Sequence, residues 1–184
     1  MCGISGYIGK EIIHSKVIKK TLSLMKNRGP DANGYSNFSD KKNNINVNLL
    51  HTRLGIIDLD KRSNQPFTIG DLTIIFNGEI YNFLEIKKKI LLKKKIKFKT
   101  HSDTEVLLQA YKIFGIKFFQ NLEGMWSFAI WDNKKKSLIL SRDRFSEKPL
   151  YIFKNQRGIY FGSEIKYLKS LSQKKFKINK GHLT

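Results

Sequence analysis

The sequence predicts one α+β domain. Its 184 residues are 40% hydrophobic, which suits a globular fold with a substantial core. Three segments carry apolar residues at helical spacing, and short apolar runs joined by polar turns occur where antiparallel hairpins are expected. Helices interleaved with hairpins indicate an α+β class, because a doubly wound fold would alternate helices with single parallel strands.

The first sixty residues predict strands around one helix. We expect a strand over Cys2–Ile8, where small and apolar residues alternate, and a helix over Lys16–Asn27. Glycine and proline place a turn at Arg28–Asp31. A lysine- and asparagine-rich loop follows at Lys41–Asn46, and then one or two strands within Val47–Leu59.

The middle of the chain predicts a strand and two helices. The strand Leu72–Phe76 ends at Asn77-Gly78, and a helix follows over Phe83–Lys95. We expect its inward side chains to be Phe83, Ile86, Ile90 and Leu91.

The second of these helices, Asp103–Phe114, begins in a capping box. The Ser102 hydroxyl is expected to accept from the Glu105 N–H while the glutamate side chain reaches back to the helix start. Gly115 stops the helix.

Four short strands fill the last third of the chain. Polar turns at Asp132–Lys136 and Asn155–Gly158 join them. The predicted strands are Met125–Trp131, Leu138–Ser141, Leu150–Phe153 and Ile159–Gly162. The tail Gln173–Thr184 is basic and weakly patterned.

Composition narrows the function classes. The net charge is +20, but lysine dominates it in runs typical of solvated faces, so we do not expect nucleic acid as the main partner. No apolar run approaches the ~20 residues of a membrane span, and no signal peptide is recognised. A single cysteine excludes an internal disulfide, which fits a cytoplasmic location.

That cysteine is Cys2, directly after the initiator methionine. If Met1 is removed, one residue carries both a thiol and a free α-amine. The amine titrates near pH ~7.7–8.0 and can act as the base that activates the thiol, with no histidine. The alternative is a small buried hydrophobic residue on a first strand. Position alone favours that alternative.

Three other sites are ambiguous from the residues alone. Asn77-Gly78 after an apolar strand is a strong hairpin-turn signal, yet an Asn amide with a Gly N–H also forms a pair of oxyanion donors. Arg53 is either a snorkelling surface residue or a bidentate carboxylate ligand. Asp103 either compensates the helix dipole or binds an ammonium group.

Taken together, an ordered set of motifs resembles the class II glutamine amidotransferase domain, most closely the N-terminal half of glutamine-hydrolysing asparagine synthetases. The set covers nearly the whole chain. Its members are Met1–Ile4, Arg28–Asp31 with Gly34, His51–Leu54, Gln65-Pro66, Asn77–Asn82, Ser102–Glu105, Leu122–Met125, Arg142–Phe145 with Lys148–Tyr151, and Gly162–Lys166.

The resemblance implies a four-layer αββα N-terminal-nucleophile hydrolase fold over residues 1–184. It implies that Cys2 attacks the side-chain amide of L-glutamine, giving a glutamyl-thioester and ammonia, then glutamate. Asn77 and Gly78 would form the oxyanion hole. Arg53 would hold the substrate α-carboxylate, and Glu79 and Asp103 its α-amino group.

The resemblance also sets expectations about cofactors and partners. No metal or cofactor is expected in this domain, because ATP and Mg belong to the synthetase half, whose nucleotide loop is absent from these residues. Expected partners are a synthetase domain, in cis or in trans, and a second copy of the chain. The alternatives are another ammonia acceptor, such as a sugar phosphate or surface polysaccharide, and a catalytically silent glutamine-binding or docking module. Ser146 stands where the family usually has glycine, so that turn is expected to differ slightly.

Overall fold

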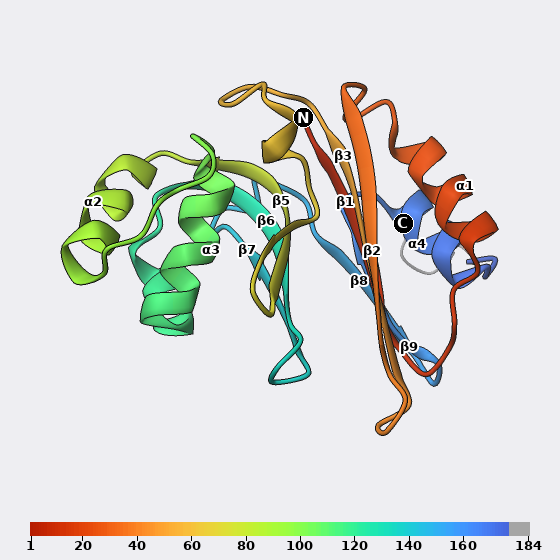
Figure 1. Ribbon diagram of the computed structural model, residues 1–184. Coiled ribbons are helices and arrows are strands. Elements are labelled where there is room, and N and C mark those ends of the chain that lie inside the picture. Colours follow the sequence, from red (N-terminus) through yellow and green to blue (C-terminus); the bar gives the residue numbers. More distant parts are fainter. Residues whose placement is uncertain (177–184) are drawn as a thin grey trace.

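Two antiparallel sheets lie face to face in the computed structural model, which describes residues 1–176 (Figure 1). In this part of the chain, the first sheet has five strands in the order β2 (Ala32–Asp40), β3 (Ile45–Arg53), β1 (Gly3–Gly9), β9 (Gly158–Gly162) and β8 (Tyr151–Asn155). The second has four, in the order β4 (Phe67–Ile69), β5 (Leu72–Ile80), β6 (Gly124–Asp132) and β7 (Ser137–Arg142).

Helices cover both outer faces of this sandwich (Figure 1). Helices α1 (Ser15–Met25) and α4 (Ile165–Ser172) pack on the first sheet, and α2 (Phe83–Lys93) and α3 (Asp103–Phe114) on the second. A third apolar cluster, which includes Ile4, Leu49, Ile75 and Trp131, fills the space between the sheets. The predicted α+β class and the four-layer αββα order are therefore confirmed.

Most predicted elements are present with small shifts at their ends. The strand predicted at Cys2–Ile8 is β1, and the helices predicted at Lys16–Asn27 and Phe83–Lys95 are α1 and α2. Helix α3 has the predicted bounds, and Gly115 caps it with a φ of 76°. The four predicted strands of the last third are β6, β7, β8 and β9. Most of the basic tail lies outside the described residues.

The prediction that the strand ends at Asn77-Gly78 is wrong. Strand β5 runs on to Ile80, and Asn77 and Gly78 pair with Ser127 and Trp126 of β6. A hairpin turn needs two adjacent strands of the same sheet to meet there, but β6 supplies a partner along the whole of β5. Long-range pairing has overridden the local turn signal.

Five elements were not predicted from the sequence. Strand β2 is mostly polar apart from Ala32, Tyr35 and Phe38, and its side chains alternate between half-buried and exposed because it is an edge strand paired with β3. Helix α4 buries Tyr167, Leu168 and Leu171 against α1. The others are the three-residue strand β4 and two 3₁₀ turns, Lys61–Ser63 and Ile116–Asn121.

Three local expectations need correction. The strand region predicted as Val47–Leu59 ends at Arg53, and the chain then loops over the pocket described below. Leu91 is 43% exposed, because it lies beside the buried stripe of Ile86 and Ile90 rather than on it. In the capping box, the Ser102 hydroxyl accepts from the Glu105 N–H as predicted, but the Glu105 carboxylate accepts from the backbone of residues 99 and 100 instead of Ser102.

The lysine runs lie on exposed or half-buried surface, as expected of solvated faces. Lys87 and Lys93 lie over the rings of Phe98 and Phe114, at 4.6 and 5.0 Å from the ring centres. Within residues 1–176, no helix combines the length and hydropathy that a membrane crossing requires.

Candidate active site

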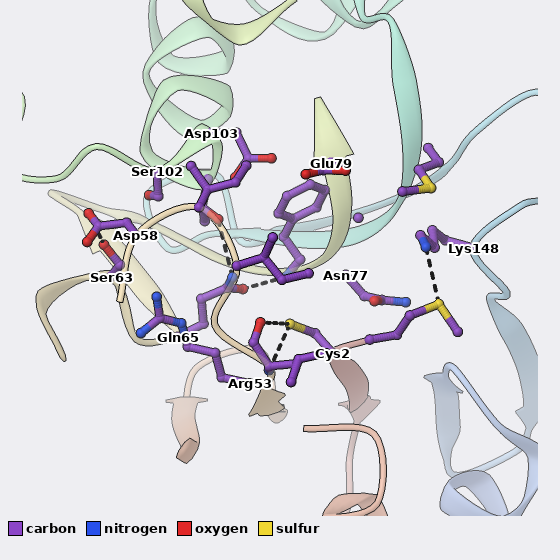
Figure 2. Close-up of a pocket in the computed structure, with 18 residues that line it drawn as sticks. Cys2, Arg53, Asp58, Ser63, Gln65, Asn77, Glu79, Ser102, Asp103 and Lys148 are labelled. Atoms are coloured by element: carbon purple, nitrogen blue, oxygen red, sulfur yellow. Dashed lines mark hydrogen bonds between the residues drawn. The ribbon is translucent and has the colours of Figure 1, made fainter. Parts of the chain in front are cut away.

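A single pocket collects all six residues that the sequence singled out. It is lined by Cys2, Arg53, Asn77, Gly78, Glu79 and Asp103, together with the loop that follows β3 and the first turn of α3 (Figure 2). Cys2 precedes β1, Arg53 ends β3, residues 77–79 lie in β5, and Asp103 opens α3. Both sheets therefore contribute to the pocket, which lies at one edge of the sandwich.

Backbone and side-chain contacts hold Cys2 in place. Its carbonyl accepts from Nε of Arg28 at 3.0 Å, and β1 pairs with β3 from the next residue onward. Its thiol lies against the backbone of Leu54, 3.5 Å from the carbonyl oxygen and 3.4 Å from the amide nitrogen. The thiol is thus fixed at the pocket wall rather than free to rotate in solvent.

The thiol is poorly nucleophilic without a base. Burial raises the pKa of Cys2, although the Leu54 hydrogen bond opposes the shift. A thiol that stays protonated at neutral pH needs a nearby proton acceptor before it can attack a substrate. Met1 is present in the structure and lines the same pocket, with its Sδ 3.2 Å from Nζ of the buried Lys148.

Asn77 carries a buried hydrogen-bond donor with no partner. The side chain is 1% exposed, and its Nδ2 makes no hydrogen bond to any described residue. Leaving such a group unpaired is costly, so a donor of this kind on a residue that lines a pocket is available to an acceptor atom of a ligand. At Gly78, a Cβ would collide with the Met125 carbonyl and the Trp126 backbone, so only glycine fits this strand position.

Arg53 is a pocket residue and not a snorkelling surface residue. It is 9% exposed, and its Nη1 donates to the Asp60 carbonyl at 3.1 Å and to Oδ1 of Asn64 at 2.9 Å. Both partners lie in the loop that follows β3. Within the described residues these bonds use Nη1 alone, which leaves Nε and Nη2 as donors for a carboxylate ligand.

The acidic side chains lie where β5 ends and α3 begins. Asp103 is 5% exposed, and its Oδ2 accepts from the Ile80 N–H at 3.0 Å. Burial raises the pKa of Asp103 to about 6, and the neighbouring charge of Glu79 adds to the shift. Asp103 lines the pocket and also lies in the first turn of α3, where its charge faces the helix dipole. Glu79, Asp103 and Arg53 line one pocket, which therefore carries both signs of charge.

Two further residues of the pocket belong to the quoted motifs, but no role was predicted for them. Gln65 is 8% exposed, and its side-chain amide bridges Phe76 and Thr104. Lys148 is 7% exposed and belongs to a turn whose backbone N–H groups point at the carboxylate of Asp143. A buried Gln and a buried Lys in polar motifs were the available signals, since both residue types are normally exposed.

Comparison with known proteins assigns the family. The model of a glutamine amidotransferase domain matches residues 1–184, so the chain belongs to this family. A putative glutamine-hydrolysing asparagine synthetase 2 of Methanocaldococcus jannaschii is 36% identical over 98% of this chain and 38% of its own length. The amidase chry2 of Gibberella zeae is 36% identical over 90% of the chain and 26% of its own length.

These relatives are much longer than the region they share with the chain, which spans 38% and 26% of their lengths. Among solved structures, a glutamine phosphoribosylpyrophosphate amidotransferase from Bacillus subtilis superposes with a TM-score of 0.74 at 20% identity. The superposition covers 93% of this chain and 44% of that one. At this identity the likeness concerns the fold, and it agrees with the four layers described above.

Proposed function

We propose that the mature chain, after removal of Met1, hydrolyses glutamine to glutamate and ammonia through a glutamyl-thioester on Cys2. One observation carries the proposal. Asn77, whose side-chain Nδ2 has no hydrogen-bond partner among the described residues, lines the same pocket as Cys2, which supports a nucleophile and an oxyanion donor that act on one substrate position.

The chemistry follows from these groups. The freed α-amine of Cys2 takes the thiol proton, and Sγ bonds to the side-chain amide carbon of glutamine. Nδ2 of Asn77 and the N–H of Gly78 donate to the oxygen as it becomes negative. The α-ammonium returns the proton to the amide nitrogen, the C–N bond breaks, and ammonia leaves. Water, deprotonated by the same amine, then cleaves the thioester to glutamate.

The opposite end of the pocket suits an amino-acid head group. The guanidinium of Arg53 binds the α-carboxylate, and the carboxylates of Glu79 and Asp103 bind the α-ammonium. A zwitterion requires both signs of charge, and the pocket offers one cation with two anions here. The distance between the charged groups and the Cys2 thiol then selects a substrate whose side-chain amide reaches Cys2.

The ammonia is proposed to serve an asparagine-synthetase-type amidation. The similarity to the asparagine synthetase of M. jannaschii supports this acceptor. A synthetase domain, in cis or in trans, would supply ATP and Mg, and the glutaminase step itself would use no cofactor. Pro149, Tyr151 and Ile165 line a surface hollow that also includes Arg28, the residue bound to the Cys2 carbonyl. Ser163, Glu164 and Lys166 also line this hollow, and its mixture of apolar and charged side chains suits docking of such a domain. We place the activity in the cytoplasm, where a single thiol stays reduced.

The test is glutamate release by the purified chain, with the N-terminal mass measured on the same sample. We expect glutamate from glutamine only where Cys2 is N-terminal, and none from Cys2→Ala with an unchanged circular dichroism spectrum. Adding aspartate and Mg-ATP to the chain alone should give no asparagine. Full glutaminase activity in Cys2→Ala would refute the thioester, and asparagine with AMP from the chain alone would refute the need for a synthetase domain.

A further inference from the structure

The strand that carries Asn77 is braced on the side facing away from β6. Strand β4 pairs with β5 only as far as Ile74, so from Phe76 onward no strand within residues 1–176 lies on this side of β5. Side chains replace the missing strand at Phe76. Its N–H donates to Oε1 of Gln65 at 2.6 Å, and its carbonyl lies 3.1 Å from Nε2 of His51.

His51 can only be a donor in this contact. It is fully buried on β3, and burial lowers its pKa to about 3, so the ring is neutral at working pH. A neutral imidazole facing a carbonyl must carry its proton on Nε2. The Phe76 carbonyl is thereby tied to the first sheet while the Phe76 N–H is tied to Gln65.

Gln65 extends this brace to the helix that carries Asp103. Its Nε2 donates to Oγ1 of Thr104 at 3.2 Å. Asp103 itself accepts from the Ile80 N–H at 3.0 Å. The first turn of α3 is thus fastened to β5 at two points, one before Asn77 and one after Glu79. Figure 2 shows Gln65 between Asp103 and the Cys2 end of the pocket.

We propose that Gln65 is a positioning residue that fixes the distance between the head-group end and the oxyanion end of the pocket, with His51 as its second support. This rests on the proposed function. A bound glutamine would span from Asp103 to Asn77, and a donor misplaced by about 1 Å can cost on the order of 10²-fold in rate. The same fixed distance would disfavour asparagine, whose amide is one methylene closer to its α-carbon.

The alternative is that Gln65 only satisfies two buried polar groups and stabilises the fold. The two roles differ in what they change. If Gln65 only stabilises the fold, replacing it lowers the unfolding temperature and leaves the kinetics of the folded fraction intact. If Gln65 positions Asn77, replacing it lowers kcat, while the charged contacts that set KM remain.

The experiment compares Gln65→Met with Gln65→Glu in the full chain with Cys2 at its N-terminus. Met matches the length of Gln but makes neither contact, whereas Glu still accepts from Phe76 and can accept from the Thr104 hydroxyl. We expect Gln65→Met to lower kcat about 10- to 100-fold with KM within about threefold, and to narrow the preference for glutamine over asparagine. Gln65→Glu should recover most of kcat.

A double-mutant cycle identifies the route of the effect. In an Asn77→Ala background, Gln65→Met should cost less than about threefold in kcat, because the donor that it positions is gone. Thr104→Val removes the hydrogen bond from Gln65 at nearly constant side-chain volume, and it should give a smaller loss of kcat. This second variant tests the proposal if Gln65→Met folds poorly. Thr21→Val, a buried hydroxyl on α1, is the control and should leave kcat unchanged.

The outcomes separate the two proposals. A wild-type chain without glutaminase activity would overturn the proposed function and this role together. An active wild type in which Gln65→Met and Thr104→Val keep the wild-type kcat, or in which the loss is fully additive with Asn77→Ala, would overturn the role of Gln65 alone. A rise in KM without loss of kcat would also overturn it.

Discussion

The two ends of the pocket are built differently. At the Cys2 end the groups that we expect to act on the amide are neutral: a thiol, a side-chain amide and the backbone of Gly78, with the ammonium of Lys148 nearby beside Met1. Their carriers, the start of β1 and the middle of β5, are held by strand pairing. At the other end the groups are charged, and they lie where β3 ends, near the end of β5 and where α3 begins.

The difference separates chemistry from recognition. Neutral donors on a rigid sheet interact weakly with a neutral amide and strongly with the oxyanion that it becomes, so they favour the transition state. Charged side chains bind a zwitterionic head group equally before and during the reaction. We therefore expect changes at the Cys2 end to alter kcat and changes at the charged end to alter KM.

The largest contrast is expected from Asn77→Ala. Loss of one oxyanion donor should lower kcat by ~10²–10³ while KM stays nearly constant. Steady-state glutamate release over a range of glutamine concentrations measures both constants. A change in KM alone would assign Asn77 to substrate binding, and it would contradict the division between a catalytic end and a binding end of the pocket.

Arg53→Ala should do the reverse. A hydrogen bond to a charged group contributes ~1.5–3 kcal/mol, so KM should rise roughly 10- to 150-fold with kcat largely retained. Because Arg53 also holds the loop at Asp60 and Asn64, Arg53→Lys is the matched variant that keeps the charge. An unchanged KM in Arg53→Ala would exclude the α-carboxylate contact.

The charged end should also respond to pH. Asp103 has a pKa raised to about 6, so it loses its negative charge as pH falls through 6, and with it the attraction for the α-ammonium. Glutamine should bind Cys2→Ala more weakly below about pH 6 than at pH 8, by calorimetry, which isolates binding from the base on Cys2. Asp103→Asn should bind weakly at both pH values. A pH-independent affinity in Cys2→Ala would contradict the role of Asp103.

The smallest effect is expected at Ser146, which lies in the turn before Lys148 but does not line the pocket. Ser146 has a φ of 61°, a conformation that costs a non-glycine residue roughly 1–2 kcal/mol. Glycine avoids this cost, but part of the gain is lost because glycine has more conformational freedom in the unfolded chain. Ser146→Gly should raise the unfolding free energy by about 0.5 kcal/mol in urea titrations and leave kcat and KM unchanged. Destabilisation would show that the Ser146 side chain contributes to the turn.

The sequence predicted the layers well and the internal connections of the pocket poorly. Helical and strand periodicity located most elements, but β2 is too polar for a periodicity rule, and the Asn77-Gly78 turn signal gave way to pairing with β6. The six site residues were proposed through resemblance, because each alone had a common structural explanation. Gln65 and His51 could not be assigned, since their partner at Phe76 is defined only once β3 and β5 lie face to face.

The most direct test of the account is to control whether Cys2 has a free α-amine. A removable leader placed directly before Cys2 makes that nitrogen an amide, and cleavage by a protease that leaves no extra residue restores the amine. Mass spectrometry identifies the N-terminus of each sample. We expect no glutamate release above background before cleavage and full activity after it. Equal activity in the two samples would contradict the α-amine as the base and Cys2 as an N-terminal nucleophile.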